Sequence, residues 1–229
     1  INLGDSYLYT YYNNVALGSS TYFNANQPND TNWLDEITDF GQTTSNFVSM
    51  SGGNETAKYY IGYTNYSEKG ILIGSEFKRN NINTRTEFKV LDDKLKISQN
   101  INLSFTNSTA KPLSAFTNAY KQSPIVPVKF ENGRWGVPLR NPDTGLIDIN
   151  GSDRFNNVGN PAAQLFYTNE QSKAFNLLGS VMAELKVHKD ITLTSSFGAS
   201  YDTNKGFSYV PLSNIYLSQN PTKTVTDYE

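Results

Sequence analysis

The sequence has no cysteine and a single histidine, His188, among its 229 residues. Without cysteine it can form no disulfide, no thiolate nucleophile and no Cys-ligated zinc or iron–sulfur site. His188 falls in a predicted turn at 187–190, where a solvated turn residue is the simpler interpretation. Because no second histidine or cysteine can partner it, the usual nucleophile–base pairs are missing. The sequence therefore does not indicate an enzyme, and no catalytic residue is predicted.

An excess of positive charge and long apolar runs are also lacking. The formal net charge is −2, which argues against a nucleic-acid partner because such partners favour a basic surface. No apolar run approaches the roughly 18–20 residues that a membrane helix needs. Hydrophobic residues make up only 37% of the chain, yet its 13% of aromatic residues argues against disorder. Something other than an ordinary soluble core is therefore expected to cover the apolar faces.

What the sequence does contain is a strong period of two. In residues 82–105, INTRTEFKVLDDKLKISQNINLSF, apolar and polar residues alternate on both sides of a break at 91–94, which predicts two antiparallel strands joined by a tight turn. The same alternation predicts four strands within residues 46–106, with short turns at 53–57 and 91–94. Two more strands are predicted within residues 170–204, with a turn at 187–190.

The two faces of these strands are expected to meet different surroundings. The side chains predicted to face lipid are Ile82, Phe88, Val90, Leu95, Ile97, Ile101, Leu103, Phe105, Leu177, Val181, Leu185, Leu193 and Phe197. Arg85, Glu87, Lys89 and Lys96 are predicted to face a wet lumen, with pairing across the strands as the simpler role for their charges.

The connections between the predicted strands alternate in length. Residues 1–45 are predicted as an external loop region with a short helix near 31–40, residues 107–169 as a long external loop, and residues 205–229 as the start of the next one. All short turns then lie at one end and all long loops at the other, as in outer-membrane barrels. Strands of about ten residues match the tilted span of a bilayer. The predicted fold class is all-β, an antiparallel up-and-down transmembrane β-barrel.

A soluble sandwich, with its apolar face packed inward, would also alternate. Its strands are usually shorter, about five or six residues, which favours the membrane interpretation. Tyr66 and Tyr201 at predicted strand ends suit an aromatic girdle at the membrane surface.

A series of short motifs adds a family resemblance. Residues 51–85 contain Ser-Gly-Gly, a Tyr-Tyr pair and a Gly-Ile…Gly-Ser…Lys-Arg run, and further motifs lie at 31–37, 123–128, 141–142 and 160–165. Their order and spacing resemble the SusC/RagA group of TonB-dependent outer-membrane transporters. The resemblance implies a barrel of about twenty-two strands, of which this chain supplies about six.

The same resemblance implies a function and a set of partners. It places the protein in the outer membrane of a Gram-negative bacterium, in contact with outer-membrane lipid, where it imports a glycan or an oligopeptide. A SusD-like surface lipoprotein would assist, and TonB would act through a plug region that is missing from this chain. Contact with that plug is then a further role for the lumen-facing charges of Arg85, Glu87, Lys89 and Lys96.

Candidate ligand-binding residues lie in the 107–169 loop, because flat rings and the guanidinium fork hold sugars or peptides well. They are Tyr120, Phe130, Arg134, Trp135 and Arg140. Anchoring of the loop is the alternative role for Trp135.

No cofactor is predicted. Asp143, Asp148 and Asp153 offer oxygen ligands in the same loop but lack the Asp-x-Asp-x-Asp-Gly spacing of a dedicated calcium loop. Calcium in the external loops is therefore left open.

Two other classes of protein compete with a transporter. One is a soluble all-β carbohydrate-binding module with Trp135 and the tyrosines as its platform. The other is a secreted β-rich glycosidase. Asp92 and Asp93 are adjacent carboxylates, but they fit turn formation better than the paired acids of glycoside hydrolysis.

Overall fold

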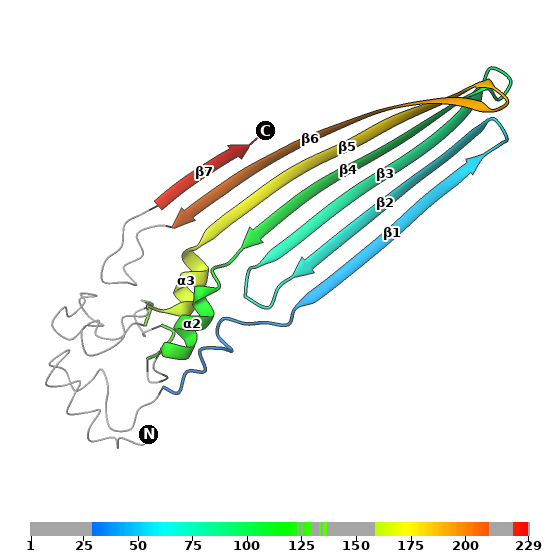
Figure 1. The fold of residues 1–229 in the computed structure, drawn as a ribbon. Coiled ribbons are helices and arrows are strands. Elements are labelled where there is room, and N and C mark those ends of the chain that lie inside the picture. Colours follow the sequence, from blue (N-terminus) through cyan, green and yellow to red (C-terminus); the bar gives the residue numbers. More distant parts are fainter. Residues whose placement is uncertain are drawn as a thin grey trace, which may run out of the picture.

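The computed structural model describes residues 29–122, 124, 126–129, 133, 135, 136, 159–210 and 222–228. Seven strands form one antiparallel sheet in chain order (Figure 1). The strands are β1 (Gln42–Gly53), β2 (Ala57–Lys69), β3 (Glu76–Val90), β4 (Leu95–Ala110), β5 (Asn169–His188), β6 (Ile191–Val210) and β7 (Thr222–Tyr228). Helices α2 (Ser114–Lys121) and α3 (Pro161–Tyr167) lie between β4 and β5 in the chain. The predicted antiparallel up-and-down sheet is confirmed.

The register places the residues predicted to face lipid on one face of this sheet. Residues paired across antiparallel strands point to the same side, and Leu103 pairs with both Ile82 and Leu177, while Val181 pairs with Phe197. We call this side the apolar face. Arg85, Glu87, Lys89 and Lys96 lie at the alternate positions, on what we call the polar face.

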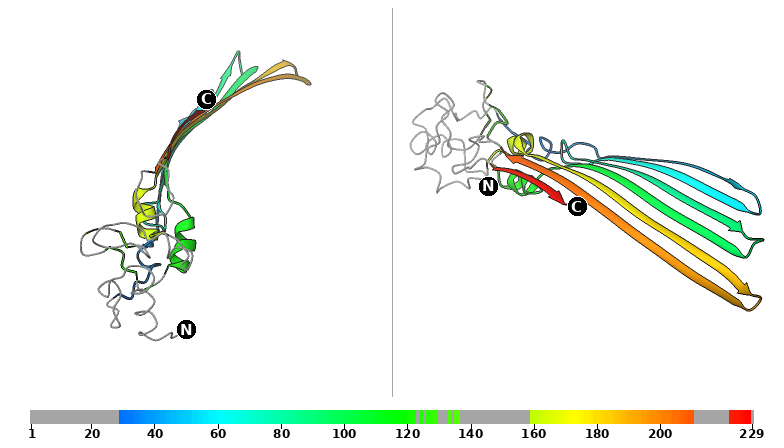
Figure 2. Two further views of the ribbon diagram at one scale, coloured as in Figure 1. Left: turned by 90° about the vertical axis from the view of Figure 1, so that its left-hand side faces the viewer. Right: turned by 90° about the horizontal axis from the view of Figure 1, so that it is seen from above.

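The sheet is a single layer, seen nearly edge-on in the left view of Figure 2. Large apolar side chains on its apolar face stay exposed, among them Val48 at 69% and Phe197 at 72%. No other described segment covers that face. A sandwich would pack it against a second sheet about 10 Å away, so the arrangement is not that of a soluble sandwich.

The strands extend further than the alternation predicts. β4 ends at Ala110, β6 ends at Val210, and β7 lies wholly within 205–229, which the sequence analysis assigned to a loop. The end of β4, NSTA, and β7, TKTVTDY, were missed because their sequences are mostly polar. A period of two is visible only where one face is apolar.

Short and long connections separate to opposite ends of the sheet (Figure 1). Residues 54–56, 91–94 and 189–190 form the short turns, while 70–75 and 111–168 form the long connections. His188 is the last residue of β5 rather than part of the turn and pairs with Ile191. It is exposed, and its Nδ1 lies 3.6 Å from Asp190 Oδ2.

The turn between β3 and β4 has an unusual backbone. Leu91, Asp92 and Asp93 have φ angles of 58°, 51° and 63°, and the Lys94 N–H donates to the Leu91 carbonyl at 3.1 Å. The left-handed region costs about 1–2 kcal/mol for a residue with a Cβ. Aspartate tolerates it better than leucine, so Leu91 carries the greater strain.

The helix predicted near 31–40 is wrong, because the structure has a hydrogen-bonded turn over residues 33–37 and an isolated bridge between Thr38 and Leu72. The Ile73 N–H donates to the Ile37 carbonyl at 3.1 Å, and the Asp39 N–H donates to the Ile71 carbonyl at 2.8 Å. Backbone pairing with the 70–75 connection therefore stops the helix after a single turn.

The described parts of 29–41, 70–75, 111–136 and 159–168 pack together at the long-loop end, and we call them the loop unit. Its hydrophobic core consists of Trp33, Ile37, Leu72, Ala115, Ala119, Val126 and Leu165. Ala115 and Ala119 are four residues apart on α2, so they share the helix face that meets this core.

Candidate functional site

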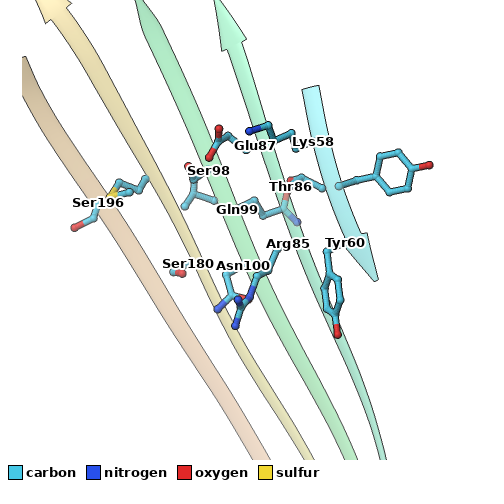
Figure 3. Close-up of a pocket in the computed structure, with 13 residues that line it drawn as sticks. Lys58, Tyr60, Arg85, Thr86, Glu87, Ser98, Gln99, Asn100, Ser180 and Ser196 are labelled. Carbon is cyan, nitrogen blue, oxygen red and sulfur yellow. The ribbon is translucent and has the colours of Figure 1, made fainter. Parts of the chain in front are cut away.

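The polar face is hollowed in its short-turn half, where β2 to β6 lie side by side (Figure 3). The hollow has a volume of about 470 Å³. Its polar-face residues are Lys58, Tyr60, Arg85, Glu87, Ser98, Asn100, Ser180, Met182 and Ser196. Serines on β4, β5 and β6 are short, whereas the side chains on β2 and β3 are long, and this difference in length creates the hollow.

Charge around the hollow is only partly paired. Lys96 Nζ lies 3.4 Å from Glu87 Oε2 and 3.6 Å from Glu184 Oε2, so one lysine serves both acids. Arg85 and Lys58 form no ion pair with any described residue. The predicted pairing across strands thus occurs for Glu87 and Lys96 but not for Arg85 or for Lys89, which lies opposite Lys96.

Hydrogen-bonding capacity in the hollow is also unused. Asn100 lies directly across from Arg85 and Ser180, and its Oδ1 is buried without a hydrogen-bond partner. Buried acceptors normally have a donor, and leaving one unpaired costs about 1–3 kcal/mol. The hollow therefore presents cationic donors, and the acceptor without a donor is buried in its wall.

At the other end of the sheet, Trp135 is engaged by the loop unit itself. Its Nε1 donates to the Tyr167 hydroxyl at 3.2 Å, and its ring centroid lies 5.5 Å from that of Phe166. Lys129 Nζ sits 4.4 Å from the centroid of the indole ring, close enough for a cation–π contact. These contacts support the anchoring role for Trp135, and its part in ligand binding stays a prediction.

Of the other candidates in the loop, the structure describes only Tyr120. Tyr120 is 77% exposed on α2. Phe130, Arg134 and Arg140 lie outside the described residues, as do Asp143, Asp148 and Asp153. Within the described part of the chain, no group of His, Asp or Glu side chains is arranged to hold a metal ion.

Asn160 organises the loop unit, a role that the sequence analysis did not assign to it. Its Nδ2 donates to the carbonyls of Val128 at 2.9 Å and Gly136 at 2.8 Å, and its Oδ1 caps α3 by accepting from the Ala163 N–H at 2.9 Å. The Asn-Pro pair before a helix is a signal for such a cap. The two carbonyl contacts have no signal in the sequence, because they join residues 24 and 32 positions apart.

A second hollow of about 440 Å³ lies in the loop unit, lined by Trp135, Phe166, Lys129 and Glu36 among others. At its edge, Lys111 Nζ donates to the carbonyls of Leu165 and Thr168, both at 2.8 Å. Burial lowers the pKa of Lys111, and the Glu170 carboxylate partly offsets that shift. Aromatic rings and charges together at this end suit contact with an external molecule.

None of the helices in the described residues is long and apolar enough to cross a membrane. No family model matches the chain. Among curated proteins, TonB-dependent receptor SusC of Bacteroides thetaiotaomicron is 29% identical over 75% of this chain and 18% of its own length. TonB-dependent receptor P3 of Formosa agariphila is 21% identical over 80% of this chain and 18% of its own length. The chain thus spans less than a fifth of these relatives.

Solved structures show the same fold. The RagAB peptide importer in its open-open state has a TM-score of 0.62 and 16% identity, covering 86% of this chain and 21% of its own. The RagAB peptide transporter has a TM-score of 0.61 and 17% identity, covering 83% and 21%. A single-layer sheet of this kind is a fragment of a β-barrel wall. The curated relatives narrow the class further, and the predicted resemblance to SusC/RagA-type TonB-dependent transporters is confirmed.

Proposed function

We propose that this chain forms part of the barrel wall of a TonB-dependent transporter in the outer membrane of a Gram-negative bacterium. The observation that carries the proposal is the apolar face, which stays uncovered across β1 to β6. Soluble proteins rarely expose an apolar surface of that extent, whereas a barrel wall covers it with lipid. The curated relatives, both TonB-dependent receptors, point to the same function.

The height of the apolar band supports a membrane-spanning wall. On β4 the face is largely apolar from Leu95 to Phe105, and in the next same-face row Asn107, Lys173 and Lys205 stand side by side. A strand needs about 9–11 residues to cross the hydrocarbon when tilted. The rest of β4, β5 and β6 therefore rises above the membrane toward the loop unit.

Aromatic rings mark the upper border of this band. Phe175 lies 4.9 Å from Phe105 and 6.3 Å from Tyr201, measured between ring centroids, as an interfacial girdle would. Tyr66 does not belong to it. That residue pairs with Arg79 on the polar face, and its hydroxyl donates to Glu68 at 2.7 Å, so the girdle predicted from Tyr66 is wrong for that residue.

The transported molecule in this proposal is a glycan or an oligopeptide, captured on the loop unit together with a SusD-like surface lipoprotein. TonB would act through a plug region carried elsewhere in the longer protein. The description of RagAB as a peptide importer favours an oligopeptide, and the exposed ring of Tyr120 offers a flat contact for either ligand. Enzymatic activity and a cofactor form no part of the proposal.

The test is fractionation of the full-length protein from its own cells. We expect it in the outer-membrane fraction, extracted only by detergent and co-purifying with a surface lipoprotein. Recovery of residues 29–228 as a folded monomer in buffer without detergent would overturn the proposal. Glycan binding by that soluble form, lost in Trp135→Ala, would instead establish the carbohydrate-binding module.

A further inference from the structure

A row of cations crosses the sheet directly above its apolar band. On the same face as the band, Lys78, Asn107, Lys173 and Lys205 occupy neighbouring positions on β3, β4, β5 and β6, which lie side by side (Figure 1). Neighbouring strands are about 4.8 Å apart, so three lysines fall within the width of four strands. All four side chains are exposed, and the row is therefore accessible to a ligand.

The positive charges of this row are not balanced within it. Lys173 lies directly opposite Lys205, and it forms no ion pair with any residue that the structure describes. Lys78 Nζ lies 2.9 Å from Glu76 Oε2, and Lys205 pairs along the backbone with Asp227 of β7. Like charges directly opposite each other on neighbouring strands destabilise a sheet. An anion held between Lys173 and Lys205 would remove that repulsion.

Aromatic residues lie on both sides of the row. Below it, at the top of the apolar band, the ring centroids of Phe105 and Phe175 are 4.9 Å apart. Above it, β6 continues on the same face with Phe207, which is half-buried, and with Tyr209, which is 40% exposed. Along this face the side chains are therefore first apolar, then cationic, then aromatic.

We infer that the row binds the phosphorylated headgroup of a glycolipid in the outer leaflet of the membrane. A phosphate group accepts hydrogen bonds from Lys173, from Lys205 and from the side-chain amide of Asn107. The acyl chains lie along the apolar band past Phe175, and a sugar ring of the headgroup lies against Phe207. The inference rests on the proposed function, because only in a membrane-spanning wall does this row lie at the height of lipid headgroups.

The order of groups along the face selects this occupant over others. Inorganic phosphate pairs with the lysines but leaves the band below them uncovered. An acidic protein surface also pairs with them, but it would have to enter lipid to reach Phe105 and Phe175. A phospholipid supplies acyl chains and a phosphate but no ring for Phe207. A phosphorylated glycolipid supplies acyl chains, negative charge and sugar rings in the order in which the face presents their partners.

Photocrosslinking of the full-length protein in detergent tests the inference. The photoreactive residue benzoylphenylalanine replaces Gln171, which lies one row above Lys173 on the same face. The protein is titrated with lipid A, a phosphorylated glycolipid, and irradiated, and the concentration that gives half the maximal yield of linked lipid measures binding at the row. We expect Lys173→Gln, Lys205→Gln to raise that concentration about thirtyfold, because two lysine contacts with an anionic lipid are lost. Lys173→Arg, Lys205→Arg should leave it within about threefold, since arginine also pairs with phosphate.

Matched controls make the result specific to this row. Lys186→Gln, Lys189→Gln removes the same charge from the short-turn end of β5 and its turn and should leave the concentration within about twofold, as expected of exposed charges. Benzoylphenylalanine at Ser172, the neighbouring residue on the polar face, should not link to lipid A.

Two further lipids separate the phosphate from the sugar. Dephosphorylated lipid A should bind the unaltered row about thirtyfold more weakly, because it offers the lysines no anion. Phosphatidic acid carries acyl chains and a phosphate without a sugar, and it should bind about fivefold more weakly than lipid A, because the contact with Phe207 is lost.

The opposing results are equally definite. Lipid A binding that is unchanged in the double glutamine variant, or that does not depend on its phosphates, overturns the inference. Equal binding of phosphatidic acid overturns the choice of a glycolipid. Fractionation decides the proposed function separately, because an outer-membrane protein extracted only by detergent that fails the crosslinking test remains a transporter wall without this lipid site.

Discussion

The sheet and the loop unit are stabilised in opposite ways. Ile37 and Val126 of the loop unit are 0% exposed, whereas Val48 and Phe197 of the sheet are 69% and 72% exposed. Apolar side chains of the loop unit thus bury one another, while those of the sheet are not covered by any described part of the chain. The same polypeptide therefore contains one part with its own core and one part that, in the proposed function, is covered by lipid.

The largest expected effect comes from a charge on the apolar face. Phe197→Lys places an ammonium in the middle of the apolar band, and we expect a loss of about 2–4 kcal/mol in the free energy of unfolding, as for lysine near the bilayer midplane. Urea unfolding of the full-length protein in lipid vesicles measures it.

Ser200→Lys is the control for this change, because Ser200 lies on the same strand but on the polar face. It should stay within about 0.5 kcal/mol of the unaltered protein. Equal losses in both variants would mean that the apolar face does not meet lipid.

The next largest effect belongs to the loop unit. Asn160→Ala leaves the Val128 and Gly136 carbonyls and the Ala163 N–H without partners, and we expect a local loss of about 2–3 kcal/mol. Hydrogen exchange should rise in 126–136 and in α3 but not in β2 or β3. Faster exchange throughout the sheet would show that the sheet and the loop unit unfold together and are not independently stable.

Two glycines sharpen the same contrast. A Cβ on Gly136 would lie 1.7 Å from the Pro127 carbonyl oxygen, whereas a Cβ on Gly179 of the sheet would meet nothing within 4 Å. We expect Gly136→Ala to lose about 1–3 kcal/mol through overpacking. Gly179→Ala should be neutral or slightly stabilising in the same unfolding measurement. Tolerance of both substitutions would contradict the close packing of the loop unit.

The smallest effect is expected in the turn between β3 and β4. Leu91→Gly relieves a φ of 58° and should raise the free energy of unfolding by about 0.5–1 kcal/mol, since glycine adopts this region without the Cβ penalty. Lys94→Gly, at the end of the same turn, serves as the comparison and should not stabilise. A lower midpoint in Leu91→Gly would show that the leucine side chain contributes a contact.

The sheet was predictable from the sequence to the extent that its surroundings differ on its two faces. Leu95 and Lys96 alternate because, in the proposed barrel wall, lipid on one face and water on the other each select one kind of residue, and that selection is local. β7 was missed because neither of its faces is apolar. The helix assigned near 31–40 failed because residues 71–73, far along the chain, offer hydrogen bonds to its end.

The candidate sites were less predictable, because they depend on the lengths of side chains on neighbouring strands and on contacts between residues far apart in the chain. The hollow exists only because Ser180 and Asn100 fall in the same row as Arg85, which requires the register. Trp135 was correctly located in the loop region, but its contact with Tyr167 joins residues 32 apart. No local pattern indicates such a pairing.

The bond between Lys111 and Thr168 bears on how this wall assembles. Lys111 directly follows β4 and Thr168 directly precedes β5. Their 2.8 Å hydrogen bond therefore holds the two ends of the 111–168 connection together. β5 then joins β4 almost as if a hairpin linked them, which spares most of the chain entropy that closing a long open loop would cost. The loop unit thus joins strands β1–β4 to strands β5–β7, and within each of these two groups neighbouring strands follow one another in the chain.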